Sequence, residues 1–385
     1  MFSKYLQKRS KSILFINPDY HCTFVYKKEL EKNGWTSEIF VPSLYPKTYL
    51  YNQENILISK LNSKFLQNRG IDDLILFGKN FFKYKFHFYY GRPPLMQLSS
   101  KFAKKIFGKT DWNVFLFLSK ISGAKIIYLP SGCRDEFNRE TFKRFDEGRV
   151  CMNCAFYQQC DEQLNNLNLR IMKKYSDLNI GAGFFRSPFI HLTALKWKSI
   201  DLDVWHPSLK IPTEFQLRSF EGLTVFHSPS SGARNSETLN IKGSIYLREA
   251  VDRLSREGFS VRLIEVENMK INDVKYFQKQ ADVIVDQLIY GQWGSVGIES
   301  MAMGKPVICY IRESWEQEFL NNFPEYSELP IIKADIASVY AVLKSLIENR
   351  HLLNEYGIKS RLFAEQHFNP KNNALELLNK LNNLR

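Results

Sequence analysis

The stretch that most constrains the fold runs from Ala281 to Tyr310 and reads ADVIVDQLIYGQWGSVGIESMAMGKPVICY. Two apolar runs, residues 283–285 and 306–310, predict buried strands. Between them, a glycine-containing loop leads into a short helix that begins near Val296 and ends at Gly304. A strand, a helix and a second buried strand in this order predict a parallel sheet in an α/β fold.

The loop and the start of this helix also predict a ligand site. Gly291, Gly294 and Gly297 lack the Cβ that keeps a ligand away from the backbone. The helix that follows presents N–H groups and the positive end of its dipole, which attract anions. Glu299 lies in its first turns, where its carboxylate can accept hydrogen bonds from hydroxyls. We therefore predict a phosphate-and-sugar site; the alternative is an ordinary strand–helix–strand unit whose glycines serve packing.

The chain around this stretch, residues 208–365, predicts a complete doubly wound unit. Strands are expected at residues 223–227 and 261–266, and helices at residues 245–257 and 271–280. The loop after the first strand is rich in Ser, Gly and Asn and carries two cations, Arg234 and Lys242. Because open parallel sheets bind ligands at the carboxyl ends of their strands, both cations are candidates for phosphate contacts.

Residues 1–207 predict a second α/β unit with strands at residues 12–17, 37–41, 85–90 and 125–129. Three loops follow strands of this sheet at its carboxyl edge: residues 18–21, 90–94 and 130–136. They make Asp19, His21 and Asp135 candidates for contacts to a substrate. The alternative is that such residues cap the helices that follow them. The last segment, residues 366–385, predicts a helix that can return to the N-terminal unit.

Four of the six cysteines fall within 28 residues of the N-terminal half, and they are Cys133, Cys151, Cys154 and Cys160. Cys151 and Cys154 have the two-residue separation with which a pair of thiolates holds a tetrahedral ion. We therefore predict a structural zinc site in an insertion at residues 133–160. An iron–sulfur cluster and ordinary or disulfide-bonded cysteines are the alternatives.

The net charge of +13 favours an anionic partner. Because the first twelve residues are polar and basic and no run of eighteen apolar residues occurs, we expect a cytoplasmic protein without a membrane span. Its basic residues are expected to allow peripheral contact with an anionic inner membrane face; plain solubility is the alternative explanation. Nucleic-acid binding is not expected, since no basic stripe with interleaved aromatics or known binding motif occurs.

The order of these parts resembles the retaining GT-B glycosyltransferases, in particular the large nucleotide-sugar-dependent family 4 (glycosyl transferases group 1). The family motif is a glutamate, seven residues, a second glutamate and Ala-Met-Ala-x-Gly-x-Pro-Val. Trp293-Gly294 stand at the position of its aromatic–Gly pair, and residues 299–307 (ESMAMGKPV) match its second half. Residues 200–207 (IDLDVWHP) resemble the segment that closes the family's first domain, and residues 132–135 lie where it often has His-Gly-x-Asp.

This resemblance implies two Rossmann-like domains that face each other across a cleft and transfer a sugar from a UDP- or GDP-linked donor to a glycan or lipid-linked acceptor, with retention. Glu299 would hold the ribose, and Arg234 and Lys242 the diphosphate, so that no catalytic metal is needed. The residues implied to contact the donor are Arg234, Lys242, Gly243, Gln292, Trp293, Gly294, Ser295 and Glu299.

The sequence departs from the family pattern at the first motif glutamate, which is Gly291 here. Contacts of that glutamate to the donor sugar are then missing or supplied by Gln292 or Asp286. The alternative function is therefore a catalytically inactive GT-B-like scaffold in a polysaccharide-synthesis complex.

Overall fold

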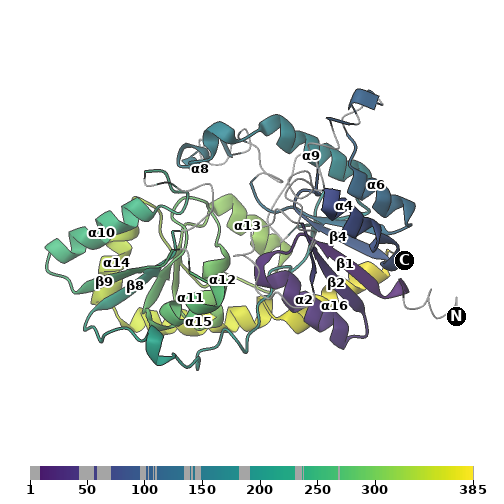
Figure 1. The fold of residues 1–385 in the computed structure, drawn as a ribbon. Helices are drawn as coiled ribbons and strands as arrows, with labels where there is room; N and C mark the ends of the chain where they lie inside the picture. The colour runs from purple at the N-terminus through teal and green to yellow at the C-terminus, as the bar shows by residue number, and fades with distance from the viewer. Residues whose placement is uncertain are drawn as a thin grey trace. The chain divides into compact units, whose positions relative to one another are not determined.

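The computed structural model of the 385-residue chain describes residues 9–42, 56–58, 71–95, 101–102, 104–106, 108, 111–133, 139, 142–143, 149–181, 191–229, 236, 238–267 and 269–384. The chain divides into two compact units (Figure 1). Unit 1 comprises residues 1–138, 161–199 and 370–385, and unit 2 comprises residues 139–160 and 200–369. The sequence predicts the insertion at residues 133–160 as part of the N-terminal unit. In the structure, residues 139–160 belong to unit 2.

Unit 1 is built on a seven-stranded parallel sheet with the order β3-β2-β1-β4-β5-β6-β7. The strands are β1 (Ser12–Ile16), β2 (Thr36–Val41), β3 (Ile56–Ile58), β4 (Phe86–Tyr90), β5 (Lys125–Leu129), β6 (Leu178–Gly181) and β7 (Thr193–Ala194). Its helices are α2 (Tyr20–Lys32), α4 (Ile71–Gly78), η2 (Phe81–Lys83), α6 (Val114–Ile121), α9 (Glu162–Tyr175) and α16 (Pro370–Asn382).

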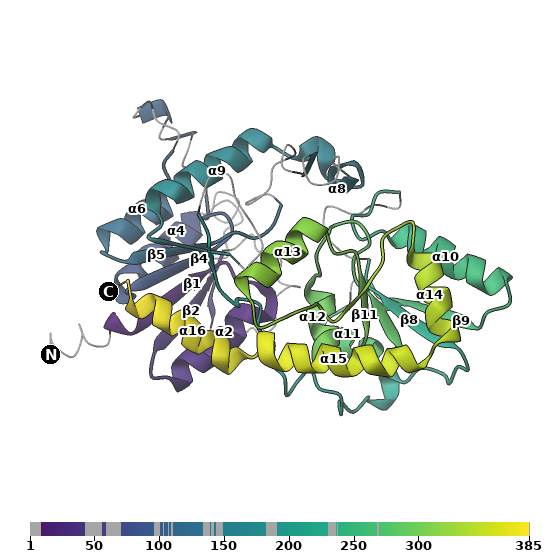
Figure 2. The same cartoon turned by 180° about the vertical axis from the view of Figure 1, so that it is seen from behind.

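Both faces of this sheet are buried, as a parallel sheet requires. Ile13 and Phe15 of β1 belong to one apolar cluster, and Leu14 and Ile16 belong to another, because successive side chains of a strand point to opposite faces. The C-terminal helix α16 packs beside α2 on the first of these faces (Figure 2). The last helix of the chain therefore completes the core of unit 1.

Unit 2 contains a five-stranded parallel sheet with the order β12-β11-β10-β8-β9. The strands are β8 (Leu223–His227), β9 (Val261–Glu265), β10 (Val283–Val285), β11 (Val307–Cys309) and β12 (Ile331–Lys333). Its helices are α8 (Arg149–Met152), η3 (Tyr157–Gln159), η4 (Thr213–Phe215), α10 (Ser244–Arg256), α11 (Ile271–Gln280), α12 (Ser295–Ala302), α13 (Glu313–Asn322), α14 (Val339–Glu348) and α15 (His351–His367). The predicted pair of doubly wound α/β units is confirmed.

A specific side chain sets the start of α6. Asn113 accepts hydrogen bonds from the backbone N–H groups of Phe115 (2.9 Å) and Leu116 (3.2 Å), so the helix begins at Val114. The long helix α15 was not predicted. It follows α14 after only two residues, and no glycine or proline marks the break.

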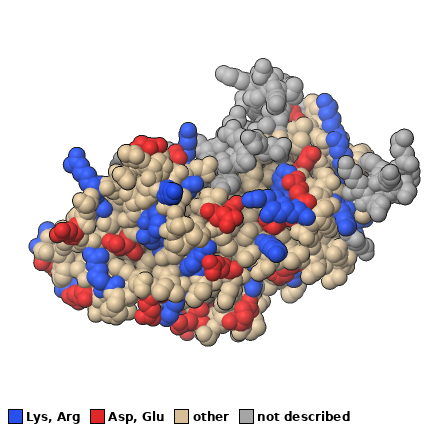
Figure 3. Space-filling model, turned by 90° about the horizontal axis from the view of Figure 1, so that it is seen from below, with Lys and Arg blue, Asp and Glu red and all other residues tan. Residues whose placement is uncertain are grey.

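Charges of both signs are interspersed on the face of the molecule shown in Figure 3. Among the described residues, the helices are too short or too polar for any of them to cross a lipid bilayer.

Candidate functional site

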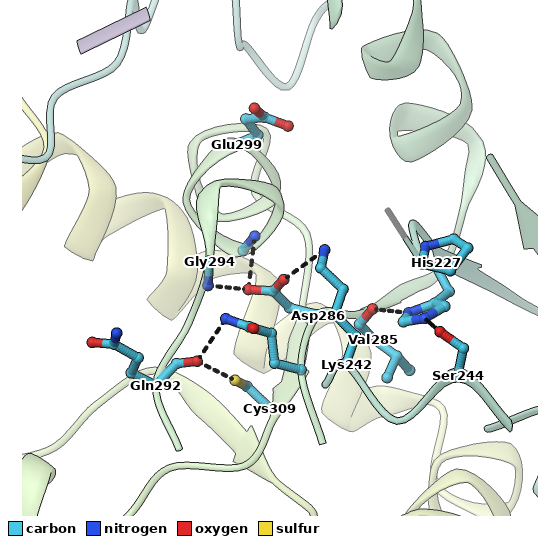
Figure 4. A network of polar contacts seen from close by, with 12 residues as sticks. His227, Lys242, Ser244, Val285, Asp286, Gln292, Gly294, Glu299 and Cys309 are labelled. Carbon is cyan, nitrogen blue, oxygen red and sulfur yellow. Dashed lines mark hydrogen bonds and ion pairs between the residues drawn. The ribbon is translucent and has the colours of Figure 1, made fainter. Parts of the chain in front are cut away.

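The candidate site lies in unit 2, where the strand order reverses between β8 and β10. Open α/β sheets bind ligands at such a switch point, beyond the carboxyl ends of the strands. His227 ends β8, and Asp286 directly follows β10. The helices α10 and α12 begin at the same edge, because each follows one of these strands (Figure 4).

Asp286 is the centre of the polar network. Its Oδ2 accepts hydrogen bonds from the backbone N–H groups of Gly294 and Gly297 (3.2 Å for the latter), and its Oδ1 lies 3.7 Å from Lys242 Nζ (Figure 4). Burial raises the pKa of Asp286 above its ordinary value, and Lys242 together with the two N–H groups opposes that rise. The start of α12, which the sequence predicts as an anion site, thus already holds an internal carboxylate.

Lys242 and Gly243 lie at the start of α10. The Lys242 side chain is only 9% exposed, so its ammonium is held at the sheet edge. Gly243 is the N-cap residue with φ of 80°, and a Cβ there would lie 2.9 Å from Leu288 Cβ, which explains the glycine. No side chain of the described residues caps α10. The first N–H groups of this thirteen-residue helix and the Lys242 ammonium together can hold an anion.

His227 ties β8, β10 and α10 together. Its Nδ1 lies 2.8 Å from the Val285 carbonyl oxygen and therefore donates, while its Nε2 accepts from Ser244 Oγ at 2.6 Å. Burial, together with the nearby charge of Lys242, lowers the pKa of His227 to about 3. This histidine is therefore neutral at pH 7, and its hydrogen bonds position the first residue of α10.

Glu299 lies on the side of α12 away from Asp286 (Figure 4). It is 3% exposed, and Oε2 accepts a hydrogen bond from Gln278 Nε2 of α11 at 3.0 Å. Burial, together with the nearby charge of Asp286, raises the pKa of Glu299 to about 8. Before a ligand binds, this carboxyl is thus largely protonated at neutral pH.

The other loop residues that the sequence predicts as donor contacts are held inside unit 2. Gln292 accepts hydrogen bonds through its carbonyl oxygen from Gln287 Nε2 (3.0 Å) and through its side chain from Trp315 Nε1 (2.8 Å). Trp293 is buried and packs edge-on against Trp315, with ring centroids 4.7 Å apart. Gly294 and Ser295 are the N-cap and first residue of α12. Trp293 thus contributes an aromatic core beside the loop.

Gly291 stands at the position of the first motif glutamate, and the Arg312 side chain fills the space where a side chain at residue 291 would lie. Its φ is 91°, and a Cβ there would lie 2.8 Å from both the Cζ and Nη2 atoms of Arg312. Arg312 is 7% exposed and donates from Nη2 to the Tyr290 carbonyl oxygen at 3.1 Å. A buried guanidinium therefore lies against the backbone where the resemblance implies a carboxylate.

In unit 1, Asp19 and His21 are almost completely buried, at 1% exposure each. Asp19 Oδ2 accepts hydrogen bonds from Trp197 Nε1 and Lys198 Nζ, each at 2.8 Å. Burial alone would raise the pKa of Asp19, but the Lys198 charge and these hydrogen bonds bring it below its ordinary value. Asp19 does not cap α2 with its side chain; instead its N–H donates to Thr23 Oγ1 at 2.8 Å. The carboxylate thus ties the loop after β1 to the chain after β7.

Two predicted site residues, Asp135 and Arg234, lie outside the described residues. The four clustered cysteines lie within the part of the chain that the structure describes. Among the described residues, however, no group of three or more His, Cys, Asp or Glu side chains is arranged to hold a metal ion. The predicted zinc site at Cys133, Cys151, Cys154 and Cys160 is therefore not supported. Its evidence was one closely spaced pair, and spacing along the chain does not bring the other two thiols to that pair.

Sequence reasoning missed His227, Gln278 and Arg312, and it considered Asp286 only as a substitute for the missing glutamate. His227 and Asp286 carry a usable signal, because each is a polar residue at the carboxyl end of a buried strand. Gln278 and Arg312 carry none, since their roles come from contacts with residues 21 positions away along the chain.

Comparison with known proteins supports the fold. No family model matches the chain, and no curated protein matches it in sequence. Among solved structures, HepE from Anabaena in complex with UDP-glucose is similar, with a TM-score of 0.56, 12% identity, and coverage of 97% of this chain and 99% of HepE. Sucrose-phosphate synthase from Thermosynechococcus elongatus is similar as well, with a TM-score of 0.57, 13% identity, and coverage of 97% and 99%. The chain therefore has the GT-B fold, resembling that of nucleotide-sugar glycosyltransferases.

Proposed function

We propose that this protein is a glycosyltransferase that moves a sugar from a nucleoside diphosphate sugar to a glycan or a lipid-linked acceptor, with retention of anomeric configuration. The observation that carries the proposal is the buried pair of Lys242 and Asp286 at the switch point of unit 2. A lysine kept at the carboxyl edge of a sheet, beside the start of a long helix, suits a diphosphate. That HepE is similar in fold and was solved with UDP and with UDP-glucose supports the nucleotide.

The chemistry follows from the charge that develops on the leaving group. When the bond between the sugar and the diphosphate breaks, negative charge grows on the terminal phosphate and the sugar becomes cationic. Lys242 and the first N–H groups of α10 would stabilise that phosphate, and removing one such donor typically costs about 3–4 kcal/mol of barrier. Asp286 would keep the Lys242 ammonium in place without a metal ion. Glu299 would accept hydrogen bonds from the ribose after rearranging its contact with Gln278.

Thermal-shift measurements with UDP, GDP and their sugar conjugates test the proposal. A nucleotide sugar is expected to raise the melting temperature of the wild-type protein, and Lys242→Ala is expected to remove the shift. Lys305→Ala is the matched control, because Lys305 Nζ donates to the Ala281 carbonyl oxygen at the opposite edge of the sheet. The control should keep the ligand-induced shift. Wild-type protein that responds to no nucleotide would rule the enzyme out.

One observation favours the alternative of an inactive scaffold in a polysaccharide-synthesis complex. At the position of the first motif glutamate, Gly291 packs against Arg312, so the donor sugar has no carboxylate there. A scaffold predicts that nucleotide binds without turnover. Incubation of UDP- or GDP-sugars with lipid and glycan acceptors, followed by mass spectrometry of the products, separates the two functions.

A further inference from the structure

A surface of unit 1 has the composition of a membrane-docking face. Between residues 74 and 133 the chain carries ten Lys and Arg residues against one acidic residue, Asp111, so this stretch supplies nine of the thirteen net positive charges. Asp111 is itself paired with Lys174, whose Nζ lies 3.0 Å from its Oδ2. The basic excess of the chain is thus concentrated on a short part of unit 1.

The same stretch exposes large apolar side chains. Phe102, Ile106, Phe117 and Ile121 are 51%, 54%, 43% and 56% exposed. Phe117 and Ile121 lie four residues apart on α6, and therefore on one face of that helix. Phe102 and Ile106 are also four residues apart, in a part of the chain that is helical at residues 101–102 and 104–106. Trp112 joins the two sets, with ring centroids 6.3 Å from Phe102 and 5.8 Å from Phe117.

Neighbouring elements extend this surface. The helix α4 contacts α6, as Figures 1 and 2 show, and exposes Ile75 (44%); η2 also contacts α6 and exposes Phe82 (53%). Exposed lysines accompany these side chains, and they are Lys79, Lys83, Lys101, Lys104, Lys105 and Lys120. We call the surface formed by residues 75, 79, 82, 83, 101, 102, 104–106, 117, 120 and 121 the basic apolar face. Protruding aromatic and aliphatic side chains rimmed by lysines are typical of surfaces that insert into the boundary of an anionic bilayer.

We propose that the basic apolar face docks on the anionic surface of a membrane, with the apolar side chains between the headgroups and the lysines on the phosphates. Anionic lipid matches the positive charge of this face. Apolar insertion distinguishes lipid from nucleic acid, because a nucleic-acid site would instead stack its aromatic side chains on bases within a groove. A membrane contact goes beyond sugar transfer, because it uses none of the residues of the nucleotide site.

Vesicle sedimentation of the full-length protein tests the proposal. Binding is expected to vesicles of phosphatidylcholine mixed with phosphatidylglycerol, to weaken with salt, and to be small with phosphatidylcholine alone. The triple variant Lys101→Ala, Lys104→Ala, Lys105→Ala should weaken binding on the order of a hundredfold, since each lysine near an anionic surface contributes roughly fivefold. A matched triple variant of exposed lysines elsewhere, Lys28→Ala, Lys210→Ala, Lys270→Ala, should bind nearly as the wild type does.

Apolar insertion has its own readout. Phe102→Ser with Ile106→Ser should reduce binding while the charge is unchanged, and the fluorescence of Trp112 should shift to the blue on vesicle binding and lose that shift in Trp112→Phe. Lys242→Ala should bind vesicles as the wild type does. A failed nucleotide assay would therefore not affect the result of the vesicle experiment. Equal loss in both lysine triples, absence of vesicle binding, or binding to oligonucleotides in preference to vesicles at physiological salt would each overturn the proposal.

Discussion

Lys242 Nζ lies 3.7 Å from Asp286 Oδ1, and both side chains are almost completely buried in unit 2. The same carboxylate accepts hydrogen bonds from two N–H groups at the start of α12. One ion pair therefore connects the loop before α10 to the glycine loop before α12. A ligand that binds at the start of α10 would meet a lysine whose position is set by the other helix.

Asp286→Asn is expected to destabilise the protein by about 3–5 kcal/mol, because it leaves the Lys242 ammonium buried without its counter-ion. Denaturant unfolding measures the loss. Asp282→Asn is the matched control at the other end of β10, where Asp282 Oδ2 accepts from the Thr224 N–H at 2.7 Å. If Asp286 positions Lys242, only Asp286→Asn will also weaken nucleotide binding; equal loss of binding in both variants would contradict this role.

Lys242→Met is expected to weaken nucleotide binding by about 10- to 100-fold, corresponding to the roughly 1.5–3 kcal/mol of a charged hydrogen bond. Removing the lysine also takes away a charge that lowers the pKa of Asp286, so that pKa should rise further. Isothermal titration calorimetry with UDP and GDP measures the affinity. Unchanged affinity in a folded variant would remove Lys242 from the site.

Glu299→Gln is expected to flatten the dependence of stability on pH. The wild-type carboxyl has a folded pKa of about 8, above its ordinary value of 4.5, so between these pH values the unfolded chain releases a proton that the folded protein retains. Wild-type stability therefore falls as pH rises through this window, by up to about 1.4 kcal/mol per pH unit. Urea unfolding across the window measures both proteins, and parallel curves would refute the raised pKa.

Gly291→Ala is expected to cost about 1–3 kcal/mol, because alanine is strained at a φ of 91° and its Cβ would press on the Arg312 guanidinium. Gly258→Ala separates the two causes, since Gly258 has a φ of 88° and its Cβ would meet nothing within 4 Å. The excess loss in Gly291→Ala over Gly258→Ala measures the contact with Arg312. For the same reasons, Gly291→Glu is expected to unfold more easily without gaining sugar transfer.

Asp19→Ala is expected to destabilise unit 1 by a few kcal/mol, because Lys198 and the buried Trp197 lose their shared acceptor. Asp161→Ala provides the comparison, since Asp161 caps α9 by accepting from the Leu164 N–H at 2.9 Å and such a cap contributes about 1 kcal/mol. Thermal unfolding by circular dichroism ranks the two variants. A smaller loss in Asp19→Ala than in Asp161→Ala would show that Asp19 is dispensable for folding, as an acceptor-binding role alone would allow.

The sequence alone predicted the elements that local pattern dictates. Residues 283–285 are apolar and flanked by polar residues, and they form β10; α11 spans Ile271–Gln280 as expected. The glycine loop and the short helix behind it follow from the backbone freedom of glycine and from helix-ending signals. Alternation of such strands and helices is sufficient to predict two doubly wound parallel sheets.

Only the tertiary structure decided which groups meet at the site. Asp286 turns toward Lys242, 44 residues earlier in the chain, Glu299 turns toward Gln278, and Arg312 lies against Gly291. Side-chain partners of this kind depend on the order of strands in the sheet and on the packing of helices against it. Sequence periodicity specifies which face of an element is buried, but it does not specify which residue from a distant element lies opposite.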